Sequence, residues 1–579
     1  MKNHITLRYA LSIYLLSCFF LTRALSQDLA AEYSVAWQKF YPTKALSEGI
    51  RNSVFHYEDY SEENITKWIH YNEETLRQLS NSETDRIDPI DSRLLKVQVQ
   101  SELDNYVKIG KHKTSLLFYT EAISKSIEPI LTAHYLLLTE KSELTCQRLI
   151  AVRKLCEAAE KNLIQVPENE LAEGMETLRD VLEFYRTSLP KSFEEDTTMH
   201  KCTDFNAYLS AAEDSIQRLM TFAATVLKTV SVATEAVLGQ EEYTRRLKLY
   251  TDSELSPDEL ARMALKEIET VRTIMAEVST AYLKTHYQQA AIMVDDNDLI
   301  LKALADMEKD APLNGAEYLE FWNELAGAAM KFIAENEIAT LPKNHTLEIK
   351  TAPESAGAAA RIGWVESAPP FDPDPMTTLY VPSIPDTLPQ QEQIDFWASF
   401  NKPFNRMIVI HELFPGHYMQ LKISRETPHP IRLLFPYGIY IEGWATFTEK
   451  VLLDAGWEAE NQLTLLAHLR KRLENANRAY TSVQVHCKGW TKEQVLKFST
   501  ETSLLAPQFA KSLWGRIMNS PLQLTSYYLG GAQFTELLAV EKNRLGNQFD
   551  LKFFMDTIMK AGPIPIDEFY HIFSKMAPK

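Results

Sequence analysis

Glycine is scarce in this chain, and no low-complexity segment divides it. Glycine occurs 18 times in 579 residues, and neither a Gly/Ser tract nor a repeat of fixed period is present. The composition therefore gives no sign of a flexible linker or a repeat array. Long segments rich in Ala, Leu, Glu and Lys favour helix throughout the chain.

Basic residues are too few to suggest a nucleic-acid partner. Lys and Arg number 60 against 78 Asp and Glu, which gives a formal net charge of −18. This acidic balance excludes a protein that binds nucleic acid through its overall charge. It favours solubility and offers only faint support for cationic substrates. Nothing in the sequence sets an oligomeric state.

Cysteines are also few, and their spacing specifies no disulfide. One of the five, Cys18, lies near the N-terminus, and the others are Cys146, Cys156, Cys202 and Cys487. A bridge between Cys146 and Cys156 would need a turn inside a segment with a helical pattern. Disulfide pairing therefore stays open, although an exported protein could form one.

Long apolar runs are absent except at the N-terminus, where residues 1–26 have the pattern of a secretory signal. Lys2 and Arg8 precede an apolar run from Tyr9 to Leu21, and residues 24–26 offer small side chains at the expected cleavage spacing. The run is too short to span a membrane comfortably. Cys18 raises the alternative of lipoprotein anchoring, but the apolar run continues past it. We therefore expect an exported protein, periplasmic or extracellular, with no stable membrane span after signal removal.

The rest of the chain predicts a mainly α fold. We expect an N-terminal helical region over residues 27–250 and a second region over 251–579, the two forming one intertwined body. Ser256 and Pro257 are typical of a helix start, and apolar residues follow at three- and four-residue steps. An alternating pattern appears only at 346–350 and 377–381, which predicts a small strand pair or lid.

The segment from His411 to His417 carries the strongest chemical signal. It places two imidazoles and the Glu412 carboxylate in an otherwise apolar run. Histidine and carboxylate are the ligands of catalytic zinc, and a further Glu can act as general base in amide hydrolysis. We therefore interpret this segment as half of a zinc site.

The six-residue spacing of these histidines is unusual. On a regular helix the spacing leaves the two side chains about 120° apart, so they could not face one metal ion. Pro415 cannot donate a hydrogen bond to the carbonyl of His411, and Gly416 tolerates unusual dihedrals. We predict a helix that bulges at Pro415 and Gly416 and turns His417 back toward His411.

A second acidic segment begins at Glu442, where Glu442 and Glu449 lie seven residues apart in a helical apolar pattern. They share one helix face but are separated by about 10.5 Å of helix rise, too far for both to bind one ion. One is expected to bind the metal and the other to fix a histidine tautomer or a substrate group. Acids embedded in Ile-Glu-Gly-Trp-Ala are poorly explained as surface salt bridges.

Two other kinds of metal site are alternatives to the predicted zinc site. A di-iron or di-manganese carboxylate bundle would use Glu-x-x-His pairs, which occur as Glu426 with His429 and Glu568 with His571. Pro428 makes the first pair a poor helix candidate. His486 beside Cys487 could suggest a soft-metal site, but no second pair lies nearby, so we interpret it as a packed loop residue.

Three motifs together resemble the bacterial domain of unknown function 885 family, which is grouped with gluzincin-type zinc metallopeptidases. The motifs are H-E-x-x-P-G-H at 411–417, E-G-W-A-x-x-x-E at 442–449 and P-x-Q-x-x-S-Y-x-x-G at 521–530. A weaker similarity covers 361–370 and 380–382. The resemblance implies a large helical metallopeptidase-like fold with a small β element near the active-site cleft.

The resemblance also implies roles for individual residues. His411, His417 and Glu442 would hold Zn²⁺, and Glu412 would act as general base. Tyr527 would stabilise the oxyanion, with Tyr528 as the alternative donor. Glu449, Gln523 and Tyr528 would support the metal shell or bind substrate.

These roles predict an exported zinc metallopeptidase that hydrolyses short peptides. The alternative is a catalytically inactive peptide-binding protein of the same fold, against which the retained Glu412 argues. The cleaved bond, and the choice between exo- and endopeptidase action, stay open.

Overall fold

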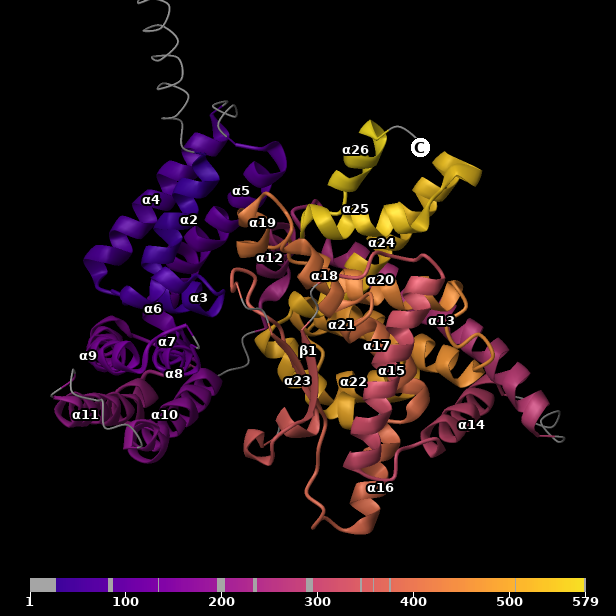
Figure 1. Ribbon diagram of the computed structural model, residues 1–579, viewed down its shortest axis with the longest axis horizontal. Helices are drawn as coiled ribbons and strands as arrows, with labels where there is room; N and C mark the ends of the chain where they lie inside the picture. The colour runs from indigo at the N-terminus through magenta and orange to yellow at the C-terminus, as the bar shows by residue number, and fades with distance from the viewer. Residues whose placement is uncertain are drawn as a thin grey trace, which may run out of the picture. The chain divides into compact units, whose positions relative to one another are not determined.

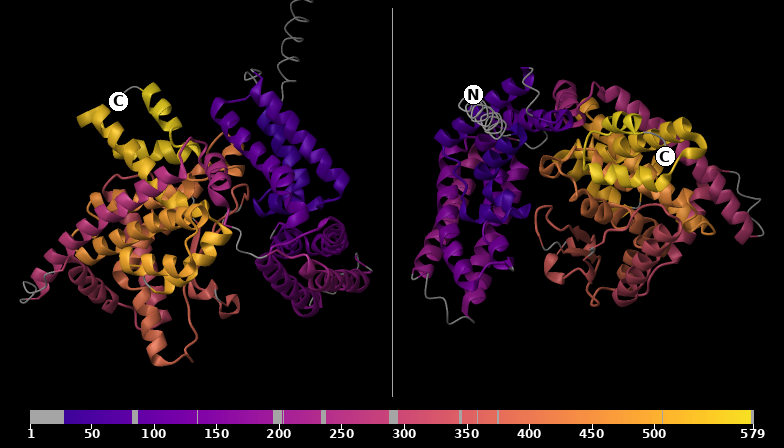
Figure 2. Two further views of the ribbon diagram at one scale, coloured as in Figure 1. Left: turned by 180° about the vertical axis from the view of Figure 1, so that it is seen from behind. Right: turned by 45° about the horizontal axis from the view of Figure 1, so that its top comes forward.

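The computed structural model describes residues 28–576 with short gaps. The gaps are residues 82–86, 134, 195–201, 203, 233–236, 288–294, 344–345, 358, 374–375 and 506. The predicted secretory signal, including Cys18, lies outside the described residues. The described chain is mainly helical with one small sheet, which confirms the predicted fold class (Figure 1 and Figure 2).

The chain forms two compact units, and the first ends at Glu235. A disulfide joins Cys146 to Cys202 in this unit, a pairing between residues 56 apart that the sequence left open, and Cys156 is a buried free thiol. Its α-helices are α2 Leu29–Phe40, α3 Pro42–Ser47, α4 Glu62–Ser80, α5 Pro89–Leu103, α6 Lys111–Thr114, α7 Leu116–Ser124, α8 Glu128–Thr132, α9 Leu138–Asn162, α10 Glu168–Glu194 and α11 Phe205–Thr225.

The second unit runs from Ala236 to the C-terminus and holds all the predicted site residues. Its α-helices are α12 Gly239–Thr251, α13 Pro257–His286, α14 Asp296–Lys309, α15 Gly315–Glu335, α16 Gln390–Ser399, α17 Lys402–Glu412, α18 His417–Ser424, α19 Pro430–Leu434, α20 Tyr440–Asp454, α21 Gln462–Lys488, α22 Lys492–Lys497, α23 Pro507–Asn519, α24 Gln523–Leu545, α25 Leu551–Ala561 and α26 Glu568–Lys575.

The division at 235/236 lies before α12, whereas the sequence placed the boundary at 250/251, within the last turn of that helix. Helix α12 packs against α13 and α21, so it belongs to the second unit. Tyr243 of α12 is buried, and its hydroxyl lies 3.1 Å from that of Ser482 on α21. The contacts across these helices, rather than any change in composition, set the boundary.

Helix α21 is the centre of the second unit and packs against α13, α17 and α24. Helix α13 begins as predicted, since the Ser256 hydroxyl accepts a hydrogen bond from the Glu259 amide and Pro257 occupies the first turn. The apolar residues of α13 at three- and four-residue steps, among them Leu260, Ala264 and Ile268, are buried. This packing holds α13 against α21.

The small sheet confirms the predicted strands and adds a third. The central strand is β3 (Thr377–Val381), which pairs in parallel with β1 (Leu347–Thr351) and antiparallel with β2 (Trp364–Glu366). Because β1 and β3 run in parallel, the two predicted strands do not form a hairpin. Lys422 of α18 donates to the Thr346 hydroxyl at 3.2 Å, so the sheet lies next to that helix.

Helices α20 and α24 touch through glycines. A Cβ added to Gly443 would lie 2.4 Å from the Cα of Gly530, and one added to Gly530 would lie 2.2 Å from the Ile439 carbonyl oxygen. Atoms cannot approach so closely, so neither position accepts a side chain. This close approach brings the first turn of α24 beside α20, where Gln523 Nε2 lies 3.4 Å from Glu442 Oε1.

None of the helices in the described part of the chain is both long enough and apolar enough to span a bilayer.

Candidate metal centre

His411 lies in the last turn of α17. The Asn401 side chain caps the helix by accepting from the Phe404 amide, and Pro403 fits the first turn. Apolar residues 407–410 are buried, which presses the C-terminal end of the helix into the core. His411 is therefore held in the interior, with 4% of its side chain exposed.

The chain does not continue as a bulged helix after His411, so that prediction is wrong. Helix α17 ends at Glu412, and α18 begins at His417, with a cis peptide bond between Phe414 and Pro415 in the break. Pro415 has no N–H to continue the backbone hydrogen bonds of α17, and its ring would crowd the preceding turn of that helix. A break rather than a bulge turns the chain, and it places both imidazoles in one site.

Gly416 allows the turn because the backbone passes too close to other atoms for a side chain to fit. A Cβ at this position would lie 1.9 Å from the His411 carbonyl oxygen and 2.2 Å from that of Ile410. The Pro415 carbonyl accepts a hydrogen bond from the Trp444 indole at 2.9 Å, which ties the break to α20. Trp444 and Glu442 both lie on α20, so this hydrogen bond also fixes the helix that carries the third candidate ligand.

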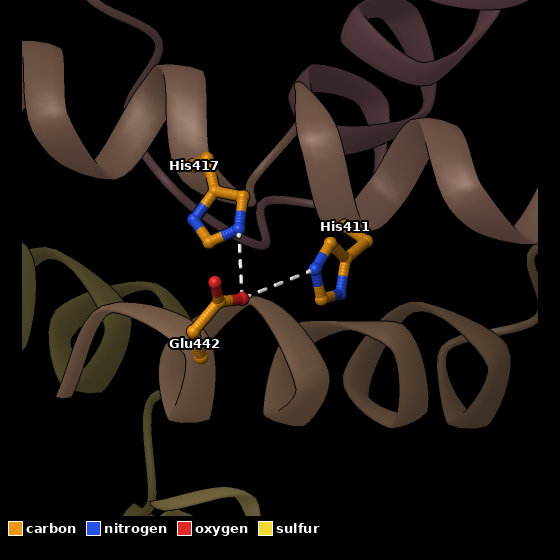
Figure 3. A group of neighbouring side chains, drawn as sticks. All are labelled: His411, His417 and Glu442. Carbon is orange, nitrogen blue, oxygen red and sulfur yellow. Dashed lines mark ion pairs between the residues drawn. The ribbon is translucent and has the colours of Figure 1, made fainter. Parts of the chain in front are cut away.

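Three side chains converge at this point, as Figure 3 shows. Glu442 Oε2 lies 3.3 Å from His417 Nε2 and 3.6 Å from His411 Nε2. All three potential ligand atoms lie within 4.8 Å of one another. The two imidazole rings are nearly perpendicular, with centroids 4.8 Å apart.

This donor set fits a zinc ion. In a tetrahedral site with bonds of about 2.1 Å, neighbouring ligand atoms lie about 3.4 Å apart. The two distances from Glu442 are close to that value, and two imidazoles with one carboxylate leave a fourth position for water. The three helices could hold the ion with small side-chain adjustments.

The electrostatic surroundings also favour a cation. Burial favours neutral imidazole, but Glu442, Glu449 and Glu412 outweigh burial and raise the pKa of His411 to about 10. Burial likewise opposes the charge of Glu442, yet His411 and His417 hold the pKa of its carboxyl well below its usual range. The carboxylates thus create a field that stabilises positive charge at the point where the ligand atoms meet.

Glu449 orients His411 from behind. Its carboxylate is fully buried and accepts a hydrogen bond from His411 Nδ1 at 2.8 Å through Oε1. Its other oxygen accepts from His468 Nδ1 at 2.9 Å. Burial opposes the charge, but these two histidines outweigh it and lower the pKa of Glu449 to about 2. The Nε2 atom of His411 is therefore directed toward Glu442, as the spacing of the two glutamates predicted.

His468 was missed by the sequence reasoning. It lies on α21 among apolar residues and is buried, with no second histidine or acid at a regular spacing. A single histidine on an apolar helix face is a weak signal, and only the fold brings it to Glu449.

Glu412 lies at the end of α17, next to His411, and is partly exposed. Its carboxylate makes no hydrogen bond or ion pair with any residue that the structure describes. A carboxylate beside the candidate ligands that is not committed to another partner is available to accept a proton.

Helix α24 presents Gln523 and Tyr527 to the site from one face. Gln523 Nε2 lies 3.4 Å from Glu442 Oε1 and 3.4 Å from the Tyr527 hydroxyl. Tyr527 and Tyr528 both line a cavity of about 390 Å³, but the contact with Gln523 is made by Tyr527. Proximity therefore favours Tyr527 over Tyr528 as the phenol beside the metal centre.

The discounted residues stay apart from this cluster. Glu426 and His429 lie between α18 and α19, and Glu568 and His571 lie on α26. Within the described residues, neither pair joins a group with metal-ligand spacing. His486 lies on α21 and not in a loop, so that part of its prediction is wrong. Its packing role is confirmed, because it is buried, accepts from the Leu238 amide and has its Nε2 3.0 Å from the Ile517 carbonyl oxygen.

The fold and site define a mostly helical protein with two histidines and one glutamate gathered as a candidate metal centre. The family described as "Bacterial protein of unknown function (DUF885)" matches residues 42–569, and the chain belongs to this family. This match confirms the family resemblance. The grouping with gluzincin-type peptidases stays a prediction.

Two solved structures share the fold. One is titled a "putative lipoprotein of unknown function" from Shewanella oneidensis, with a TM-score of 0.80 and 19% identity over 94% of this chain and 99% of that one. The other is a "putative lipoprotein" from Colwellia psychrerythraea, with a TM-score of 0.74 and 18% identity over 95% and 99% of the two chains. No curated protein matches this sequence.

Proposed function

We propose that this protein is an exported zinc-dependent peptidase of the gluzincin type that hydrolyses short peptides. The observation that carries the proposal is the convergence of His411, His417 and Glu442, with ligand atoms within 4.8 Å and an uncommitted Glu412 beside them. A zinc ion held there would supply Lewis-acid activation of water and of the scissile carbonyl.

Three protein side chains supply proton transfer, oxyanion stabilisation and control of the His411 tautomer. Glu412 accepts a proton from the attacking water and returns it to the leaving amine as the C–N bond breaks. Tyr527 donates a hydrogen bond to the carbonyl oxygen as negative charge develops on it. Glu449 keeps His411 in the tautomer that presents Nε2 to the site.

The recessed position of the site supports short peptides as substrates. The side chains of His411, His417 and Glu442 are 4%, 14% and 22% exposed. A folded protein surface cannot easily present a peptide bond to groups this deep. Export is supported by the pattern of residues 1–26 and by the word lipoprotein in the titles of both structural neighbours. Lipid attachment at Cys18 is the alternative that those titles favour.

Incubation with a defined library of short peptides tests the function. We expect cleavage products by mass spectrometry with the zinc-loaded protein, loss of cleavage after chelation and recovery when zinc is restored. Cleavage that survives chelation would rule out a zinc mechanism. Binding of peptides without any cleavage would favour the inactive peptide-binding alternative.

Glu449 offers a second test. Glutamine at this position is neutral and cannot accept from both His411 and His468, so Glu449→Gln is expected to weaken zinc binding about 10- to 100-fold. Competition with a fluorescent chelator measures this affinity. Glu541→Gln is the matched control, since Glu541 is also buried but pairs with Arg544 on the same long helix α24. Equal affinity in the two variants would contradict the orienting role.

A further inference from the structure

A cluster of cations lies beside Tyr527, on a chain that is acidic overall. The Arg478 guanidinium of α21 stands 4.6 Å from the centre of the Tyr527 ring, and that of Arg516 on α23 stands 6.0 Å from it. Arg516 Nη2 also lies 3.4 Å from the Tyr527 hydroxyl. Sequence reasoning singled out neither arginine.

The cations outnumber the carboxylates in this cluster. Glu474 pairs with Lys471 at 3.3 Å and with Arg478, so one carboxylate serves two cations. Burial opposes the charge of Glu474, but Arg478 and Lys471 outweigh it and lower the pKa of the carboxyl to about 2. Arg516 has no carboxylate within ion-pair distance among the described residues. Arg516 attracts Glu474 only at longer range, where Lys471 and Arg478 already pair with that carboxylate.

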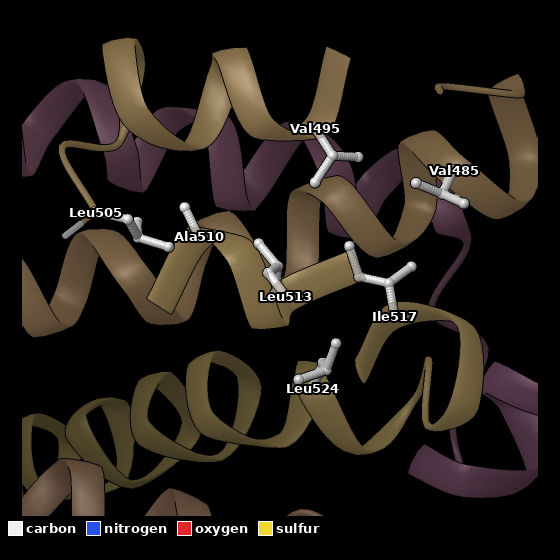
Figure 4. Packing of buried hydrophobic residues seen from close by; sticks show 7 residues of the cluster. All are labelled: Val485, Val495, Leu505, Ala510, Leu513, Ile517 and Leu524. Carbon is white, nitrogen blue, oxygen red and sulfur yellow. The ribbon is translucent and has the colours of Figure 1, made fainter. Parts of the chain in front are cut away.

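The position of Arg516 is set by the core rather than by a flexible loop. Ala510, Leu513 and Ile517 of α23 pack with Val485 of α21 and Leu524 of α24 in one buried cluster (Figure 4). These residues occupy one face of α23, and Arg516 extends from another. Because Leu524 follows Gln523, the same cluster fixes the helix turn that faces Glu442.

A short path of contacts links Arg516 to the metal centre. The contacts from Glu442 to Gln523, from Gln523 to the Tyr527 hydroxyl and from that hydroxyl to Arg516 are each 3.4 Å. An extended peptide covers about 3.5 Å per residue. The path is therefore no longer than about three substrate residues.

We propose that Arg516 binds the C-terminal carboxylate of the substrate, so that the enzyme is a carboxypeptidase releasing about three residues or fewer. This inference rests on the proposed peptidase function. A guanidinium binds a carboxylate through two parallel hydrogen bonds, and a free chain end supplies the negative charge that Arg516 lacks. Tyr527 lies between the bound chain end and the reacting carbonyl.

Matched peptides test the inference on the full-length zinc-loaded protein. Each peptide that the library experiment shows to be cleaved is prepared as the free acid and as the C-terminal amide. We expect kcat/KM for the acid to exceed that for the amide about tenfold or more, since hydrogen bonds to charged groups are the strong ones. Mass spectrometry is expected to show release from the C-terminal end only.

Variants assign the effect to one side chain. Arg516→Gln is expected to lower kcat/KM for the acid about 10- to 100-fold, mainly through KM, and to lower kcat/KM for the amide much less, so that the preference for the acid is lost. Arg516→Lys is expected to retain part of the preference because it keeps the charge. Arg544→Gln is the control, since Arg544 already pairs with Glu541 at 2.6 Å and lies in the last turn of α24, away from the path.

Three results would overturn the inference while leaving the peptidase function intact. The first is equal cleavage of acid and amide by the unaltered protein, which needs no variant to fold. The second is an equal loss of both activities in Arg516→Gln. The third is cleavage of an amidated peptide ending in Glu as efficiently as the acid, since a side-chain carboxylate would then be the ligand. Failure of the peptidase function itself appears differently, as no cleavage of any peptide.

Discussion

Glu412→Gln is expected to lower peptide turnover about 100- to 10,000-fold while zinc content stays unchanged. Glutamine has the shape of glutamate but cannot accept a proton from water at neutral pH. Glu412 is not among the three groups that converge on the candidate metal position, so the ligand set survives the change. The expected result is therefore a metal-loaded protein that binds peptides without cleaving them.

The rate of product formation by mass spectrometry and zinc content by elemental analysis check this prediction together. Glu426→Gln is the matched control, because Glu426 is an exposed glutamate after α18 that lies outside the cluster. It is expected to retain full activity. Turnover in Glu412→Gln equal to that of the control would remove Glu412 from the mechanism.

His417→Ala is expected to abolish stoichiometric zinc binding. The variant keeps only two of three ligands, so its loss of affinity should exceed the about 10- to 100-fold typical of replacing an outer hydrogen-bond partner. His417 is the first residue of α18 and 14% exposed, and alanine is compatible with that helical position. The folded protein should persist without its metal.

Elemental analysis after dialysis against a limiting zinc buffer measures the zinc bound per chain. His571→Ala is a suitable control, since His571 is exposed on α26 and lies apart from the cluster. The control is expected to bind one zinc per chain. A full equivalent of zinc in His417→Ala would mean that the six-residue histidine pair is not the metal site.

The helical elements and the three candidate ligands could be predicted because their signals are local. The Ser256 cap, the apolar periodicity of α13 and the alternation at 377–381 each lie within a few residues of the element they define. The two candidate motifs likewise consist of neighbours in the chain. The seven-residue spacing of Glu442 and Glu449 was enough to predict that only one of them lies with the candidate ligand atoms and that the other contacts a histidine from behind.

The form of the break after His411 could not be predicted from the same residues. Pro415 and Gly416 indicated an irregularity, but a bulged helix and two separate helices are both compatible with them. The Trp444 indole that holds the Pro415 carbonyl comes from another helix, and so do the contacts that hold α18. Those contacts select between the two forms.

Residue types, caps and periodicity were sufficient to indicate a mainly helical protein with a zinc-type donor set, since each depends on spacing along the chain. Packing alone brought His468 to Glu449, Arg516 to Tyr527 and Cys146 to Cys202. These partners lie on different helices or loops, and no periodic pattern connects them. The contact between Gly443 of α20 and Gly530 of α24 shows the reason, because the close approach of the two backbones places the Gln523 amide of one helix beside the Glu442 carboxylate of the other.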